Sequence, residues 1–250
     1  MTAARGDAVR LVAVGDSITR GRSSSPWLPL VGAALPPGSA TTNAGVDGDR
    51  VSSALRRLPR RALGEATHVV VLLGTNDILR QLSNARRRGR FVKRTGRAVF
   101  EQAFRRDLTE LVRRLRHEST AAVAVGSLPP VGEHGSDDAA RAVSAVNAVI
   151  RAVCGDAGVT VLPLHERLVA LRQRYASAAG PSFCGSRMMM RAAVRRRILR
   201  WSFTQCAVAE GFVALSDGIH LSESGARELA ALVSGWVSES AAERAGDATE

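Results

Sequence analysis

A serine, an aspartate and a histidine occur along the chain in a pattern that could support acyl transfer. Ser17 follows the apolar run of residues 11–14 after Gly15 and Asp16. A serine hydroxyl is a weak nucleophile until a neighbouring base removes its proton. His220 could be that base, and Asp217, three residues before it, could reach the imidazole within one turn, fix its tautomer and stabilise the imidazolium. These three residues are the candidate catalytic set.

Acyl transfer also needs hydrogen-bond donors directed at the negative charge that develops on the carbonyl oxygen. Gly45 could offer a backbone N–H that no Cβ obstructs, and Asn76 a side-chain amide. The N–H of Ser17 would be a third donor, so we expect an oxyanion hole made of these three residues. Two nearby carboxylates have structural interpretations. Asp16 is expected to cap the turn that follows it, and Asp77 to be structural.

The apolar segments of the chain predict the elements that would position these residues. Short apolar runs closely followed by glycine or proline predict strands, and apolar residues that recur at steps of three and four predict helices. The predicted strands are residues 10–14, 40–43, 68–73, 121–125 and 159–162. The predicted helices are residues 26–35, 51–58, 97–117, 139–153 and 222–237, the last with Ser222 as its N-cap.

Alternation of buried strands with helices predicts an α/β fold, in which helices cover both faces of a parallel sheet. In such sheets ligands bind beyond the carboxyl ends of the strands. Ser17, Gly45 and Asn76 each lie two or three residues beyond a predicted strand. The candidate site is therefore expected at that edge of the sheet.

Four ordered sequence blocks resemble those of the GDSL-like (SGNH) hydrolases. They are residues 14–19 (VGDSIT), 43–45 (NAG), 74–77 (GTND) and 217–220 (DGIH). The resemblance covers about residues 10–130 and 205–238. It implies a flavodoxin-like three-layer α/β/α sandwich, no metal or other cofactor, and hydrolysis of carboxylic esters or thioesters through an acyl-enzyme. The functional residues of the family fall on Ser17, Gly45, Asn76, Asp217 and His220.

Two alternatives to an esterase follow from other features of the sequence. The resembling family includes transacylases, so an acyltransferase with the same three catalytic residues is the first. The net charge of +12 suggests the second, a module that binds nucleic acid or an anionic surface on a degenerate scaffold. Aromatic residues are only 4% of the chain, and no known nucleic-acid motif occurs, so we expect a small-molecule or lipid ester as partner and no specific nucleic acid.

The length of 250 residues suits a single domain that spans residues 1–250. The N-terminal region has no pattern of a secretory signal, and no apolar run reaches the roughly 18 residues of a membrane span. The three cysteines are too few and too irregular for a disulfide framework. These observations predict a cytoplasmic protein, and they leave its oligomeric state open.

Two arginine-rich segments, at about residues 80–97 and 180–203, are interpreted as insertions in the core of strands and helices. The first is expected to be a mobile solvated loop, with an electrostatic landing site for an anionic substrate as the alternative. The second is expected to be a helix packed on the core, with a solvated basic face. Its alternative is a lid or surface helix that meets an anionic membrane or an acyl carrier. The apolar stripe of this helix is Met190, Val194, Ile198 and Trp201, and its basic face is Arg187, Arg191 and Arg195.

Overall fold

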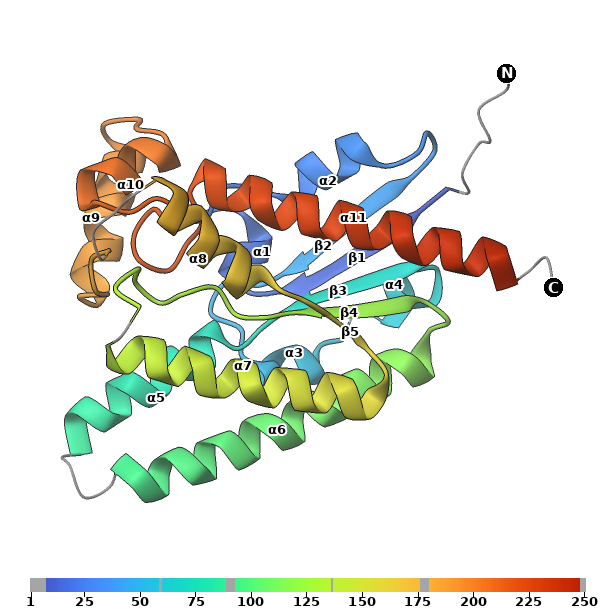
Figure 1. The fold of residues 1–250 in the computed structure, drawn as a ribbon, viewed down its shortest axis with the longest axis horizontal. Coiled ribbons are helices and arrows are strands. Elements are labelled where there is room, and N and C mark those ends of the chain that lie inside the picture. Colours follow the sequence, from blue (N-terminus) through green and yellow to red (C-terminus); the bar gives the residue numbers. More distant parts are fainter. Residues whose placement is uncertain (1–7, 59, 89–92, 136, 176–179, 248–250) are drawn as a thin grey trace.

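The computed structural model describes residues 8–58, 60–88, 93–135, 137–175 and 180–247 of the chain. At its centre lies a five-stranded, wholly parallel sheet with the strand order β2-β1-β3-β4-β5 (Figure 1). This is the flavodoxin-like order that the resemblance implies. The strands are β1 (Arg10–Gly15), β2 (Ala40–Gly45), β3 (His68–Leu72), β4 (Ala122–Gly126) and β5 (Thr160–Leu162).

Alternate side chains of the central strands belong to two separate hydrophobic clusters. Val12 and Val14 of β1 pack into one cluster, whereas Leu11 and Ala13 pack into the other. Successive side chains of a strand point to opposite faces, so both faces of the sheet are buried. This explains why the central strands β1, β3 and β4 are nearly continuous apolar runs rather than alternating ones.

Helices cover the two faces in the manner of a three-layer sandwich (Figure 1). The cluster around Val12 includes residues of α3 to α7, and the cluster around Leu11 includes residues of α1, α2 and α8 to α11. The helices are α1 (Ser17–Arg20), α2 (Leu28–Ala34), α3 (Val51–Arg56), α4 (Arg60–Gly64), α5 (Thr75–Arg88), α6 (Lys93–Glu118), α7 (Asp138–Ala157), α8 (Leu164–Tyr175), α9 (Ser186–Arg197), α10 (Phe203–Glu210) and α11 (Glu223–Asp247).

The ends of several helices differ from the predicted ones because capping groups, rather than the last apolar residue, terminate a helix. The helix α7 begins after Asp137, whose carboxylate accepts from the N–H of Ala140 at 2.8 Å, and it ends at Gly158 in the left-handed conformation. The expected capping by Ser222 is present, since its Oγ accepts from the N–H of Gly225 at 3.2 Å. The helix that follows, α11, continues ten residues past the predicted end at Val237, as far as Asp247.

The prediction of a mobile loop at residues 80–97 is wrong for most of that segment. α5 extends to Arg88 and α6 starts at Lys93, so the arginines of this run lie mainly at the facing ends of two helices. Arginine has a high helix propensity, which allows helices to continue through such runs. Residues 89–92 lie outside the described part of the chain.

The helix expected within residues 180–203 is present as α9, but the prediction of which face is buried is wrong. Met188 and Ala192 are buried, whereas Met190, Val194 and Ile198 are 65%, 46% and 71% exposed. The predicted basic face is instead partly directed at the protein. Arg191 and Arg195 both form ion pairs with Glu210 of α10, at 2.7 and 2.5 Å.

Candidate active site

The three strands β2, β1 and β3 end side by side, at the point where the strand order changes direction. Gly15 at the end of β1 is in register with Gly45 of β2 and with Leu72 of β3. The chain leaves β1 toward one neighbour and later returns toward the other, which opens a crevice at the carboxyl edge. Residues that follow these three strands are therefore brought together, as the sequence predicts.

Ser17, His220 and Asp217 form a continuous chain of hydrogen bonds at this edge. Ser17 Oγ lies 3.0 Å from His220 Nε2, and His220 Nδ1 lies 2.7 Å from Asp217 Oδ2. Asp217 and His220 are only 3% and 8% exposed, while Ser17 is half-buried. With the carboxylate on Nδ1, the imidazole carries its proton there and directs the lone pair of Nε2 at the serine hydroxyl.

A tight turn presents Asp217 and His220 together. Besides the imidazole, the Asp217 carboxylate accepts from the N–H groups of Ile219 and His220 at 3.0 and 2.9 Å. Gly218 adopts a left-handed conformation, with φ of 85°. The residue before the turn, Ser216, donates its N–H to the carbonyl of His220 at 2.7 Å. The three-residue spacing thus lets the Asp217 carboxylate reach the imidazole of His220 within one turn, as the sequence predicts.

The turn is fastened beside the nucleophile candidate by the segment that follows α1. The N–H of Leu221 donates to Ser24 Oγ at 3.0 Å, and the N–H of Ser25 donates to the carbonyl of Leu221 at 3.0 Å. Ser24 and Ser25 are only a few residues beyond Ser17. These contacts explain how two segments separated by 203 residues come within hydrogen-bond distance.

A buried carboxylate that sequence reasoning missed holds the stretch leading into this turn. Glu133 accepts from three successive N–H groups, those of Val213, Ala214 and Leu215, at 2.8–3.1 Å. Arg172 neutralises the same carboxylate at 3.2 Å. A single glutamate in a loop has no sequence pattern of its own, so only the fold identifies this role.

The pKa of His220 is raised above its usual range. Burial disfavours the imidazolium, but the hydrogen bond to Asp217 and the charges of Asp217 and Asp16 outweigh burial. A base of this kind takes a proton from serine more readily than a free imidazole does.

Asp16 performs the predicted capping, and it also contacts Asn76. Its Oδ1 accepts from the N–H of Ile18 at 2.9 Å, and its Oδ2 accepts from the Asn76 amide at 3.1 Å. Burial raises the pKa of Asp16 to about 7, against the lowering effects of the Ile18 N–H and of His220. The second hydrogen of the Asn76 amide is donated to the carbonyl of Asp49 at 3.0 Å. Asn76 is thus next to the site, with both amide hydrogens engaged.

Gly45 lies at the site, but its N–H is engaged in another hydrogen bond. This N–H donates to Asn43 Oδ1 at 3.0 Å. A Cβ at Gly45 would lie 2.5 Å from the N of Arg20 and 2.9 Å from the carbonyl oxygen of Asp16. Glycine is therefore needed here so that the end of β2 can approach α1 closely, and the expected role of its N–H is not supported by this geometry.

Gly48, three residues further on, was not singled out by sequence reasoning. It has φ of 77°, and a Cβ there would meet no atom within 4 Å. Within the described residues its N–H has no hydrogen-bond partner, and the same holds for the N–H of Ser17. Gly48 immediately precedes Asp49, which contacts Asn76. Its signal in the sequence would have been the Asp-Gly pair of a turn.

Asp77 has the structural role that was predicted. Its Oδ2 accepts from the N–H of Val51 at 3.2 Å and so connects the start of α5 to the start of α3. Burial raises its pKa to about 6. In the described ranges, no group of three or more His, Cys, Asp and Glu residues is placed to hold a metal ion, and no helix is long and apolar enough to cross a membrane.

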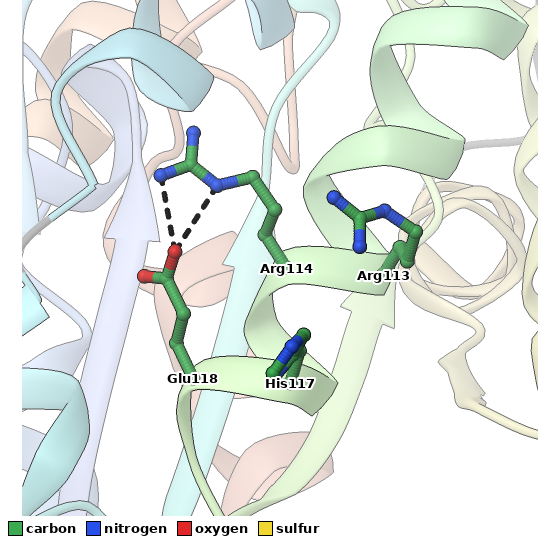
Figure 2. A pocket seen from close by; sticks show the side chains of 4 residues that line it. All are labelled: Arg113, Arg114, His117 and Glu118. Atoms are coloured by element: carbon green, nitrogen blue, oxygen red, sulfur yellow. Dashed lines mark hydrogen bonds and ion pairs between the residues drawn. The ribbon is translucent and has the colours of Figure 1, made fainter.

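Of two hollows in the described part of the protein, one adjoins the candidate site and the other lies at the opposite edge of the sheet. The first has a volume of about 370 Å³ and is lined by residues that include Leu82 of α5 and Phe183. The ring of Phe183 lies 3.0 Å from where a Cβ at Gly218 would be. This hollow therefore adjoins the turn that carries His220. The other, of about 540 Å³, lies at the end of α6 (Figure 2). Since β4 starts just after α6, the second hollow is at the amino edge of the sheet, opposite the site. It is lined by Arg113, Arg114, His117 and Glu118.

Comparison with solved structures shows the same fold in several esterases. The acetyl xylan esterase AlAXEase matches with a TM-score of 0.66 and 14% identity over 92% of this chain and 99% of that chain. A catalytic mutant of Axe2, an acetylxylan esterase from Geobacillus stearothermophilus, matches with a TM-score of 0.65 and 15% identity over 93% of this chain and 94% of that one. A member of the lipolytic protein G-D-S-L family from Veillonella parvula matches with a TM-score of 0.57 and 19% identity over 90% and 96%.

No curated protein matches the chain by sequence. The model of the GDSL-like Lipase/Acylhydrolase family, however, matches residues 13–228, which include all five residues of the predicted site. The match covers most of the chain and agrees with the five-stranded parallel fold shared with the esterases. The protein is an ester-bond hydrolase, and it belongs to the GDSL-like Lipase/Acylhydrolase family.

Proposed function

We propose that the protein hydrolyses carboxylic esters through an acyl-enzyme formed on Ser17. The observation that carries the proposal is the unbroken hydrogen-bonded chain from Ser17 through His220 to Asp217, at the crevice where this fold binds ligands. The separations of these three side chains support the roles of nucleophile, base and orienting carboxylate in this proposal.

In this mechanism Ser17 Oγ attacks the ester carbonyl carbon while His220 Nε2 takes its proton. The resulting imidazolium is stabilised by Asp217, and it donates the proton to the leaving alcohol as the ester bond breaks. Water then attacks the acyl-enzyme, and His220 removes its proton in the same way. The acid is released and Ser17 recovers its hydrogen.

We propose that the oxyanion is held by the N–H of Ser17, the N–H of Gly48 and the side-chain amide of Asn76. The two backbone donors have no other acceptor among the described residues. The amide must redirect one hydrogen from Asp16 or Asp49 toward the oxyanion. Gly45, whose N–H is engaged by Asn43, serves in this proposal to let β2 pack against α1.

The test is turnover of p-nitrophenyl acetate by Ser17→Ala. Loss of the nucleophile is expected to lower kcat on the order of 10⁶-fold, to the limit of detection. Ser23→Ala is the matched control, because Ser23 is an exposed serine in the segment just after α1. A fluorophosphonate should label Ser17 in the unchanged protein and in the control, but not in Ser17→Ala. Wild-type rates in a folded Ser17→Ala protein would refute the proposal.

The same acyl-enzyme could be intercepted by an alcohol instead of water. Product analysis in the presence of acceptor alcohols separates the two reactions, since a transferase yields a new ester while the hydrolase yields the free acid. A parallel panel of phospholipid esters and acyl thioesters identifies the acyl donor.

A further inference from the structure

The exposed face of α9 combines large apolar side chains with arginines. Four of the eight large apolar side chains that are exposed in the described part of the chain are Met190, Val194, Ile198 and Leu199. At 3.6 residues per turn, the first three follow one another along a single stripe. Met188 and Ala192, which anchor the helix, lie on the opposite side. The stripe therefore points away from the protein.

Arginines flank this stripe on its own segment of the chain, which carries no acidic residue. Residues 180–203 contain six arginines and no Asp or Glu. Arg191 and Arg195 are engaged by Glu210 and hold α9 against α10. Arg187 and Arg197, beside the stripe, and Arg200 after it are exposed. Long arginine side chains can extend from an apolar surface to place their charge in a polar layer.

The backbone at Arg200 adds an independent observation. Among the described residues it is the one non-glycine residue in the left-handed region, with φ of 57°. The N–H of Trp201 closes the end of α9 by donating to the carbonyl of Arg195 at 3.1 Å. Glycine is the favoured residue at such a position. An arginine here costs conformational energy while adding a charge to the basic rim.

We propose that the stripe and its arginines form a docking surface for an anionic phospholipid membrane. A helix that lies in a membrane interface has an apolar face and basic flanks, as α9 has. The stripe is a ridge on an exposed helix, which suits insertion among lipid headgroups. An acidic carrier protein would match the arginines but would also need apolar side chains to cover Met190, Val194 and Ile198. An anionic bilayer supplies both kinds of contact, with charged headgroups for the arginines and acyl chains for the apolar stripe.

The surface is joined to the catalytic edge of the sheet. α9 and α10 lie beyond the carboxyl ends of the strands (Figure 1). On the buried side of α9, the Met188 sulfur would be 3.1 Å from a Cβ at Gly218, in the turn between Asp217 and His220. A membrane bound to α9 thus lies beside the site. Docking itself requires no catalysis, so it stands apart from the proposed function.

The experiment is flotation with vesicles of phosphatidylcholine alone and of phosphatidylcholine mixed with phosphatidylglycerol. The protein should float only with the anionic vesicles, and less so as salt increases. A variant with Met190→Ser, Val194→Ser and Ile198→Ser and a second with Arg187→Gln, Arg197→Gln and Arg200→Gln should each bind more than about tenfold more weakly.

Matched controls remove equivalent groups from other surfaces. Leu30→Ser, Val99→Ser and Tyr175→Ser remove three exposed apolar side chains, and Arg105→Gln, Arg106→Gln and Arg113→Gln remove three exposed charges from α6. Both controls should bind as the unchanged protein does, and these two controls and the two α9 variants should keep p-nitrophenyl acetate turnover without vesicles.

The Ser17→Ala variant should float normally, which separates docking from catalysis. Equal losses in the α9 variants and their controls would overturn the proposal. So would failure to float with anionic vesicles, whether or not an acidic acyl carrier protein binds instead.

Discussion

The amide of Asn76 and the carboxylate of Asp16 are joined by a hydrogen bond of 3.1 Å directly beside the serine nucleophile of the proposed mechanism. Asp16 precedes Ser17 in the chain and caps the helix that Ser17 begins. One buried carboxylate therefore fixes both the proposed nucleophile and a proposed oxyanion donor. This arrangement makes the position of Asn76 depend on the charge state of Asp16.

Asn76→Ala is expected to lower kcat for p-nitrophenyl acetate by about 10²–10³-fold, with little change in KM, because it removes an oxyanion donor that acts mainly in the transition state. Asp16→Asn keeps an oxygen for the Ile18 N–H but turns an amide toward the amide of Asn76. It should lower kcat by up to about 10²-fold through misplacement. A change confined to KM in both variants would contradict these roles.

The activity should decline on the acid side as His220 becomes protonated. Because Asp217 raises the pKa of His220, kcat/KM is expected to fall as the pH decreases through a value above 6.5. Asp217→Asn removes the charge that favours the imidazolium while burial remains, so the acid limb should move to lower pH. The maximal rate should also fall by about 10⁴-fold, since the tautomer is no longer fixed. An acid limb at the same pH in both proteins would be inconsistent with this assignment.

The pH dependence of stability should report the buried Asp16. Its pKa is about 7 in the folded protein against an ordinary 3.8, so between these values the folded state retains a proton that the unfolded chain has lost. The contribution of Asp16 to the free energy of unfolding therefore decreases as the pH rises from about 4 to about 7, by at most about 1.4 kcal/mol per pH unit. His220, Asp77 and Asp49 face the same carboxylate and also titrate or carry charge.

Denaturant unfolding at several pH values checks this linkage. Asp16→Asn should show a shallower decline over the same interval than the unchanged protein, whatever its absolute stability. Parallel curves for the two proteins would show that Asp16 does not hold a raised pKa.

Gly45→Ala is expected to destabilise the protein by about 1–3 kcal/mol and to lower activity, because the new methyl group must displace the backbone of α1, which carries Ser17. Gly48→Asn is the matched comparison. Asparagine tolerates a left-handed conformation, and a Cβ there meets open space, so its effect on unfolding should be smaller. Equal stability losses, measured by denaturant titration, would argue against the packing role of Gly45.

Much of the fold was predictable because its signals are local. The buried strands β1 and β4 are apolar runs that end at glycine, and the Asp-Gly-Ile-His segment needs only one turn to join Asp217 to His220. The position of Ser17, the proposed nucleophile, was predictable because it lies just after the first strand. These features depend on neighbours in the chain, which a sequence displays.

The features that escaped prediction depend on distant neighbours. The periodicity of α9 identifies a stripe, but the anchoring of Arg191 and Arg195 by Glu210 decides which side faces the protein. Similarly, the choice between the N–H of Gly45 and that of Gly48 depends on where Asn43 directs its side chain.

The carboxylate of Glu133 holds the backbone of the stretch from Val213 to Leu215 by hydrogen bonds. Three successive amides share one buried acceptor, so we expect them to exchange their hydrogens with solvent in a common opening. The segment that leads to Asp217 and His220 is therefore tethered to the loop after β4. In a hydrogen-exchange experiment, this irregular stretch should be protected as if it were a strand.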